Sequence, residues 1–231
     1  MKTIGLIGGM SWESSAEYYR IINRETQRRV GGVASAKIVL YSVNFAELEA
    51  MQRTGRWNDA VEMMADAGCR LAHAGADFIL IGANTMHVAA DAIEAAAGIP
   101  VLHIVDVTAA AVREAELKCV GLLGTAYVME KEFYKGRLVE KHGLDVIVPD
   151  PADRREVHRV IFEELVRGML KDSSRAAYRE IIARLAAQGA EGVILGCTEI
   201  PLLVKPKDTA IPLFDTTEIH ALAAVEKALA P

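Results

Sequence analysis

The sequence predicts an α/β protein made of two pseudo-symmetric parallel-sheet domains with a cleft between them. Three observations support this fold class. Short apolar runs alternate with longer helical patterns, an order that produces parallel sheets with helical crossovers. Most of the short runs are apolar on consecutive residues, as strands buried on both faces are. Several segments of the first half also recur, in the same order, in the second half.

The individual elements follow from these patterns along the chain. Strands are predicted at 3–8, 37–43, 77–82, 100–104, 119–124, 144–148, 192–196 and 211–214. Helices are predicted at 13–29, 56–73, 86–97, 106–117, 128–142, 153–170, 174–188 and 216–229. Asp215-Thr216-Thr217-Glu218 has the form of a capping box, which predicts the start of the last helix. Gly189 follows helix 174–188 as a stop signal.

An internal repeat divides the chain into two halves. The matching pairs are 75–85 with 189–199, 4–8 with 120–124 (each followed by a tyrosine, Tyr18 or Tyr134), and 99–102 with 211–214. On this register Cys197 corresponds to Ala83. Because 211–214 matches a first-half strand in sequence, we expect a first domain of 1–105 and 211–231 and a second domain of 106–210.

The composition restricts the classes of function. The 231 residues are 52% hydrophobic and 25% charged, as in an ordinary globular protein. No basic run indicates nucleic-acid binding, and no apolar stretch reaches the roughly 18 residues that span a membrane. An odd, sparse set of three cysteines argues for a reducing, cytoplasmic location. Neither metal-ligand spacing nor a G-x-G-x-x-G fingerprint occurs, so we expect no metal and no dinucleotide cofactor.

Four predicted strand ends carry glycines followed by polar residues, and ligands in such sheets bind beyond the carboxyl ends of the strands. The helix starts that follow offer free N–H groups, which suit a carboxylate. We therefore expect a small acidic or amino-acid substrate. The candidate binding residues at these turns are Met10, Ser11, Asn84, Thr85, Thr125 and Thr198. Gln52 and Arg167 are candidate specificity contacts, although both equally fit surface positions of helices.

Cys197 is the strongest catalytic candidate. It lies between Gly196 and Thr198 at a predicted strand-to-helix turn, which should lower the thiol pKa below the free value of about 8.5. The alternative is a small buried hydrophobe, the interpretation that we adopt for Cys69 and Cys119. Glu199 could orient or protonate the thiol. Alternatively, it could simply occupy the first turn of a helix, where acidic side chains are favoured. His87 is the nearest alternative base, although a lone histidine at the start of a helix is more often a packing or hydrogen-bonding residue.

The combined motifs resemble the cofactor-independent aspartate/glutamate racemase family, in its aspartate or broad-specificity branch. They are Ile7-Gly8-Gly9-Met10-Ser11-Trp12-Glu13-Ser14, Asn84-Thr85-Met86-His87, Gly121-Leu122-Leu123-Gly124-Thr125 with Met129-Glu130 and Phe133-Tyr134, and Gly196-Cys197-Thr198-Glu199. The resemblance covers nearly the whole chain. It implies a site in the cleft between two similar domains, no pyridoxal phosphate or metal, and commonly a homodimer.

The resemblance also implies proton transfer at the α-carbon by two groups, one on each face. The family position before Asn-Thr usually holds cysteine, or threonine in some members, whereas this chain has Ala83, which cannot carry a proton. The leading hypothesis is an amino-acid racemase with Cys197 as acid/base and the second base missing. The alternatives are a one-base relative, such as a decarboxylase or isomerase of a small carboxylic acid, and a weakly active binding protein for a dicarboxylate or amino acid.

Overall fold

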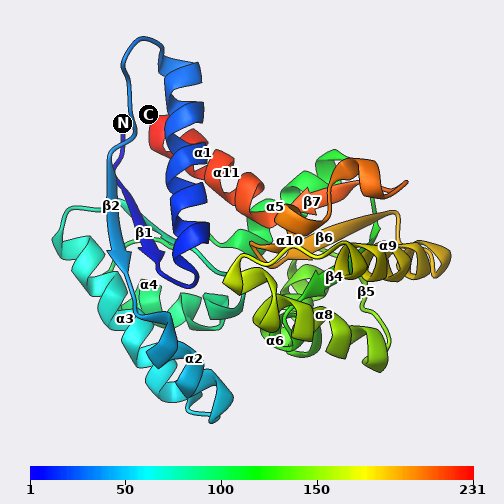
Figure 1. Ribbon diagram of the computed structural model, residues 1–231. Coiled ribbons are helices and arrows are strands. Elements are labelled where there is room, and N and C mark those ends of the chain that lie inside the picture. The colour runs from blue at the N-terminus through cyan, green and yellow to red at the C-terminus, as the bar shows by residue number, and fades with distance from the viewer. The chain divides into compact units, whose positions relative to one another are not determined.

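The computed structural model describes residues 1–231 and contains two compact units. The first unit comprises Met1–Ile104 and His220–Pro231, and the second comprises Val105–Ile219. Each unit has its own β-sheet flanked by helices (Figure 1). All strand pairs in both sheets are parallel. The predicted fold class, α/β with two parallel sheets, is confirmed.

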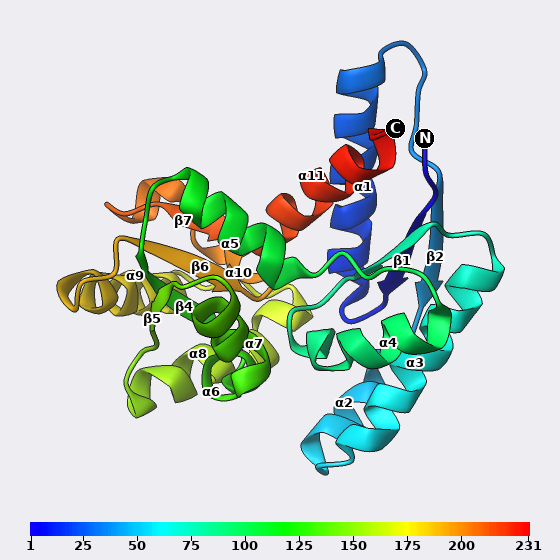
Figure 2. The same ribbon diagram turned by 180° about the vertical axis from the view of Figure 1, so that it is seen from behind.

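The sheet of the first unit has the strand order β2-β1-β3. Its elements are β1 (Ile4–Gly8), α1 (Trp12–Val30), β2 (Ile38–Ser42), α2 (Phe45–Arg53), α3 (Trp57–His73), β3 (Phe78–Ile81), η1 (Thr85–Ala89), α4 (Ala90–Ala97) and the last helix, α11 (Thr216–Leu229). Helices α1 and α11 cover the face that carries Ile4 and Leu6. Helices α3 and α4 cover the other face, which carries Ile7 and Ile79, as the opposite views of Figures 1 and 2 show.

The sheet of the second unit has the order β5-β4-β6-β7. Its elements are α5 (Ile104–Glu114), β4 (Cys119–Gly124), α6 (Ala126–Glu130), α7 (Glu132–Gly136), η2 (Arg137–Lys141), β5 (Asp145–Ile147), α8 (Pro151–Glu163), η3 (Leu165–Arg167), α9 (Asp172–Ala187), β6 (Gly192–Gly196), α10 (Ile200–Leu203), η4 (Pro206–Asp208) and β7 (Leu213–Asp215). Helices α8 and α9 pack against Leu123, Val193 and Leu195 on one face of this sheet.

Equivalent residues of the internal repeat make the same backbone hydrogen bond in both units. In the first unit the Ile79 N–H donates to the Pro100 carbonyl at 2.9 Å, and in the second the Val193 N–H donates to the Pro212 carbonyl at the same distance. The third sequence pair, 99–102 with 211–214, therefore occupies equivalent edges of the two sheets. In the first unit this edge is a single bridge between Ile79 and Val101, and in the second it is the strand β7.

The acidic residue in each Gly-Ala-acid segment has the same structural role in both units. Asp77 accepts the Thr3 N–H at 2.5 Å, and Glu191 accepts the Cys119 N–H at 3.0 Å. Each carboxylate thus holds the start of the neighbouring central strand, β1 or β4. These bonds lower the pKa of Glu191, chiefly through the Cys119 N–H.

Several local features differ from the sequence-based expectation. The predicted strand at 100–104 contributes only the bridge at Val101, because helix α5 already begins at Ile104. The helix α2 was not predicted; Asn44 begins it by accepting the Ala46 N–H at 3.2 Å. The long helix predicted at 128–142 is divided into α6, α7 and η2.

The chain returns to the first unit through α11. Asp215 accepts the N–H groups of Thr217 and Glu218 at 2.9 and 3.2 Å, so the predicted helix start is confirmed. The sequence places the return at 211, but 213–215 pair with β6 in the second sheet, and the division lies between Ile219 and His220. The helix then packs on the first sheet.

A buried histidine fixes α11 within the first unit. His220 is 0% exposed, and its Nε2–H donates to the Leu102 carbonyl at 2.7 Å. Its Nδ1 consequently accepts from the Tyr18 hydroxyl at 2.8 Å. The ring is therefore neutral, and burial lowers the pKa of His220 to about 4. His87 is its other aromatic neighbour, with ring centroids 5.7 Å apart.

We predict that His220 makes the first unit sensitive to acid. Its folded pKa lies below the unfolded value of about 6.5, so the stabilisation is complete above pH 6.5 and declines as the pH falls towards 4. Between pH 6.5 and 5 the free energy of unfolding should fall by about 2 kcal/mol more in the native chain than in His220→Gln. Urea denaturation at both pH values measures this; equal pH dependence in the two proteins would contradict it.

Candidate functional site

The first cluster of candidate residues begins where β1 passes into α1. Ser11 precedes the helix and accepts the Ser14 N–H at 3.4 Å, while Ser15 accepts the Gly9 N–H at 2.8 Å. Gly9 has φ +91°, and a Cβ there would lie 2.2 Å from the Val43 carbonyl oxygen, so only glycine fits this turn. Ser11 and its neighbour Met10 are buried. The turn thus holds two of the predicted binding residues in a fixed conformation.

The second turn of this unit follows β3 and carries Ala83, Asn84 and Thr85, all of them buried. It lies beside the first turn because the Gly82 N–H donates to the Ile7 carbonyl at 2.8 Å. Met10 and Ala83 belong to the same buried cluster. The structure therefore brings the predicted residues of both first-half turns together.

Gln52 also joins this first-unit cluster. It lies on α2, is buried, and its Nε2 donates to the sulfur of Met86 at 3.1 Å. Met86 directly follows Thr85, so the amide of Gln52 is close to the second turn. Of the two interpretations left open by the sequence, a surface position is excluded for Gln52.

Both ring nitrogens of His87 are engaged by the backbone. The Nδ1–H donates to the Ala83 carbonyl at 2.9 Å, and Nε2 accepts the Ile104 N–H at 3.1 Å. This pattern requires a neutral ring with its proton on Nδ1. The ring of His103 is 4.7 Å away, centroid to centroid. His87 therefore holds the turn that carries Ala83 against the start of α5.

The second cluster lies at the carboxyl ends of β4 and β6 in the second unit. Gly124 and Gly196 are register partners in these strands, and a Cβ on Gly124 would lie 2.9 Å from the Gly196 carbonyl oxygen. Thr125 and Cys197 follow these glycines, so the strand register places them side by side. Thr125 also begins α6 by accepting the Val128 N–H at 3.3 Å.

The thiol of Cys197 is hydrogen-bonded to a carboxylate. Its Sγ lies 3.1 Å from Oε2 of Glu199, and the Thr198 hydroxyl donates to the same oxygen at 2.8 Å. Cys197 and Glu199 are 7% and 5% exposed. Since a carboxylate only accepts, the thiol is the donor, and the resting form of Cys197 is protonated.

The expected lowering of the Cys197 pKa is wrong for this structure. Burial raises the pKa of the thiol well above its usual value, and the negative charge of Glu199 raises it further. The N–H groups of Glu199 and Ile200 do lower it, as the turn predicted, but they are outweighed. The helix that follows, α10, has only four residues, so its dipole contributes little.

Arg167 is separate from these contacts. It is exposed at the end of η3, and its backbone N–H donates to the Glu164 carbonyl at 3.0 Å. Glu164, by contrast, is buried and is held by Ser174 at 2.6 Å and by Arg159 at 3.0 Å. Of the two interpretations that the sequence offered for Arg167, the structure agrees with a surface position. A contact between Arg167 and a substrate stays a prediction.

His158 is a residue that the sequence analysis missed. Its Nδ1 accepts the Ala126 N–H at 3.1 Å, next to the predicted binding residue Thr125, and burial lowers its pKa. Its ring is tilted by 47° to that of Phe162, with centroids 4.8 Å apart, and both residues line a cavity of about 280 Å³. A single histidine within a predicted helix carried no signal for this contact.

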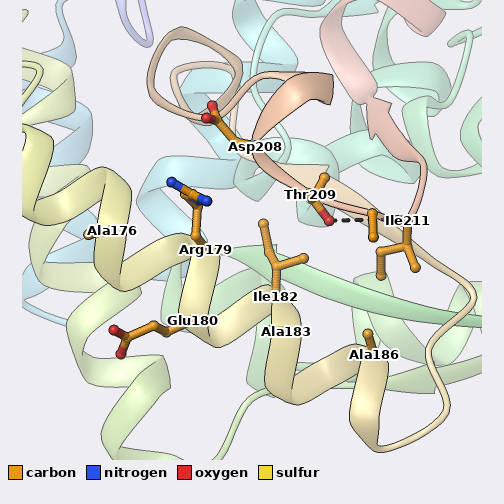
Figure 3. A pocket seen from close by; sticks show the side chains of 10 residues that line it. Ala176, Arg179, Glu180, Ile182, Ala183, Ala186, Asp208, Thr209 and Ile211 are labelled. Carbon is orange, nitrogen blue, oxygen red and sulfur yellow. Dashed lines mark hydrogen bonds between the residues drawn. The ribbon is translucent and has the colours of Figure 1, made fainter.

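A larger groove of about 560 Å³ lies in the second unit between α9 and the residues that precede β7 (Figure 3). Ala176 and Ile211 lie on opposite sides of it, and its charged lining residues are Arg179, Glu180 and Asp208. The Ile211 N–H donates to the Thr209 hydroxyl at 3.3 Å at its other side. None of the candidate site residues lines this groove.

Comparisons with known proteins support the two-sheet α/β fold. A sequence model of the Asp/Glu/hydantoin racemase family matches residues 7–224. A Yersinia pestis protein described as a candidate Asp/Glu racemase is 53% identical with full coverage of both chains and a TM-score of 0.94. An aspartate racemase homologue from Pyrococcus horikoshii OT3 is 34% identical, again with full coverage of both chains, with a TM-score of 0.83.

A curated relative extends this similarity. The broad-specificity amino-acid racemase RacX of Bacillus subtilis (strain 168) is 26% identical over 165 residues, which are 71% of this chain and 70% of RacX. No helix of the present structure has the length and apolarity needed to cross a membrane.

Because the family model matches residues 7–224, the chain belongs to the Asp/Glu/hydantoin racemase family and is an enzyme of the isomerase class.

Proposed function

We propose that this enzyme exchanges the α-proton of a small amino acid without a cofactor, with Cys197 as the acid/base group. The observation that carries the proposal is the 3.1 Å contact between the Cys197 thiol and the Glu199 carboxylate. This pair holds one proton between sulfur and oxygen, so the thiol can lose it to Glu199 and then accept the α-proton of a substrate. Family membership supports the amino-acid substrate class.

We assign substrate binding to the turns of both units. In the first unit these are the turns of Ser11 with Met10 and of Asn84 with Thr85, with Gln52 beside them. In the second unit they are Thr125 and Thr198. Backbone N–H groups at helix starts are suited to a carboxylate, which every amino acid carries. Because the Bacillus relative is named as a broad-specificity racemase, several amino acids should be tested as substrates.

Ala83 makes the proton transfer one-sided. It occupies the position of the first unit that corresponds to Cys197 in the repeat, and its methyl group has no exchangeable proton. When the Cys197 thiolate takes the α-proton, the electron pair of the C–H bond stays on the substrate as a carbanion stabilised by its carboxylate. Return of a proton from the same thiol regenerates the starting enantiomer. Inversion needs a proton donor on the other face.

His87 is the first alternative donor, but its ring is committed to the Ala83 carbonyl and the Ile104 N–H. Proton transfer by His87 would require one of these bonds to break. Because Ala83 supplies no second acid/base group, two other functions are also compatible with the chain. These are a one-base decarboxylase or isomerase of a small carboxylic acid, and a weakly active binding protein. A cytoplasmic location, inferred from three free cysteines, stays a prediction.

We predict that Glu199→Gln lowers the pKa of Cys197. The substitution removes the negative charge that disfavours the thiolate while it keeps an oxygen that can accept from the thiol. In a Cys69→Ser/Cys119→Ser background, the pH profile of alkylation by iodoacetamide should shift to lower pH. Glu199→Asp keeps the charge and is the matched control. An unchanged or higher inflection in Glu199→Gln would show that the carboxylate does not restrain the thiol.

We predict that the native chain exchanges the α-proton of one enantiomer faster than it racemises that enantiomer. In D₂O, nuclear magnetic resonance follows deuterium incorporation and chiral chromatography follows inversion of the same sample. Ala83→Cys supplies the missing donor and should increase racemisation by about 10²–10⁴-fold, the usual value of a general acid or base. Cys197→Ser in both backgrounds is the control for the thiol.

Each outcome separates the hypotheses. Fast racemisation by the native chain, unchanged by Ala83→Cys, would mean that another group serves the second face, and loss of it in His87→Asn would identify that group. If neither exchange nor racemisation occurs with any amino acid, the racemase proposal fails. Decarboxylation of a small dicarboxylic acid would then favour the one-base enzyme, and binding without turnover would favour the binding protein.

A further inference from the structure

The peptide group between Thr125 and Ala126 is hydrogen-bonded at both ends. Its N–H donates to Nδ1 of His158 at 3.1 Å, and its carbonyl accepts the N–H groups of Val128 and Met129, each at 3.0 Å. Because a peptide group is planar, these bonds fix its orientation and the extended conformation of Thr125, with φ −62° and ψ 160°. The candidate binding turn after β4 is thus supported by a histidine from a distant helix.

His158 lies on a part of α8 that is fixed to the core of the second unit. The preceding residue, Val157, is 0% exposed and belongs to the same buried cluster as Cys197. The hydroxyl of Tyr178, another buried member of this cluster, donates to the Val157 carbonyl at 2.9 Å. The backbone beside His158 is therefore held by both packing and a hydrogen bond, and the imidazole is an acceptor in a fixed place.

The bond from Ala126 to His158 depends on the protonation state of the ring. Nδ1 can accept only while it carries no proton, so the ring is neutral and has its proton on Nε2. Burial lowers the pKa of His158 below its usual value of about 6.5, and the negative charge of Glu130 opposes this shift. Protonation of Nδ1 would set two N–H donors against each other and break the bond.

The groups that face the ring come from α6 and α8, around the cavity of about 280 Å³. Its charged lining residues are Glu130, Arg154, Arg155, Arg159 and Glu163, and the Tyr127 ring lies 6.1 Å from that of His158. Glu130 is paired with Arg154 at 3.2 Å, and Arg159 with Glu163 at 3.2 Å. Since Arg155 and Glu163 are exposed, the cavity is open to solvent, and His158 can exchange protons in the folded chain.

We propose that His158 is a positioning residue for the substrate-binding turn. Its neutral ring orients the Thr125–Ala126 peptide, and protonation of the ring releases the turn and weakens the binding of substrate by Thr125. His158 acts through Thr125 and transfers no proton to the substrate, because its Nδ1 is committed to the backbone. The inference rests on the proposed function, in which Thr125 contacts the amino acid beside Cys197.

Nuclear magnetic resonance of the isotope-labelled chain tests the hydrogen bond without any substrate. Between about pH 8 and about pH 5, the Ala126 amide signal should move with the same midpoint as the His158 ring. His158→Asn replaces Nδ1 with an amide oxygen that does not titrate, so the Ala126 signal should become independent of pH. His158→Leu has nearly the shape of asparagine but no acceptor, so the Ala126 amide should exchange with solvent at least about tenfold faster than in His158→Asn.

His73→Asn, at an exposed histidine of the first unit, is the matched control and should leave the titration of Ala126 unchanged. Two results would overturn the proposal. One is an Ala126 signal that still titrates in His158→Asn, and the other is equal amide exchange in the asparagine and leucine variants. Because these two variants lose the same aromatic contact with Phe162, a difference between them reports the acceptor alone.

The kinetics of α-proton exchange test the effect on the site. At about pH 8, His158→Leu should raise KM for the amino acid at least about fivefold and change kcat less than about twofold, as loss of uniform binding does. His158→Asn should keep the native KM, and as the pH falls the native KM should rise relative to that of His158→Asn. An unchanged KM in His158→Leu would refute the positioning role. If the native chain exchanges no amino acid, the proposed function fails, and the amide signals alone decide whether His158 holds the turn.

Discussion

The parallel pairing of a central strand with its neighbour is the interaction on which both candidate clusters depend. In the second unit the pairing of β4 with β6 sets Gly124 beside Gly196, and the functional residues follow these glycines. In the first unit the pairing of β1 with β3 has the same effect on the turns of Ser11 and Ala83. At the opposite ends of the central strands, the carboxylates of Asp77 and Glu191 bind backbone N–H groups. The strands are thus fixed at one end by a charge and at the other by the close contact that only glycine permits.

Much of this arrangement could be predicted because its causes are local in the sequence. Consecutive apolar residues identify strands buried on both faces, and glycines followed by polar residues identify their carboxyl ends. The repeat added the correspondence between the halves, which is visible in the equivalent bonds from Ile79 to Pro100 and from Val193 to Pro212. Asp215 showed where the last helix begins, because a cap depends on residues next to it in the chain.

The features that the sequence did not predict depend on contacts across the fold. The turn at Cys197 supplies the expected N–H groups, but no local pattern shows that the Glu199 side chain turns back to the sulfur or that the site is buried. Helix α2 buries only Leu48 and Gln52, so its apolar stripe is too short to be distinguished from a loop. His158 accepts the Ala126 N–H although the two residues are far apart in the sequence. A single sequence cannot reveal such a contact.

The position of α11 has a consequence for the order in which the protein is made. The second unit is continuous from Val105 to Ile219, so its whole chain has been synthesised before the first unit has received its last helix. Until then, the face of the first sheet that carries Ile4 and Leu6 lacks the covering that α11 provides. Since domains generally fold as units, the first unit can complete its core only after the whole of the second unit has been synthesised. A chain interrupted between Ile219 and His220 would therefore keep every residue of the second unit and leave an apolar face of the first sheet exposed.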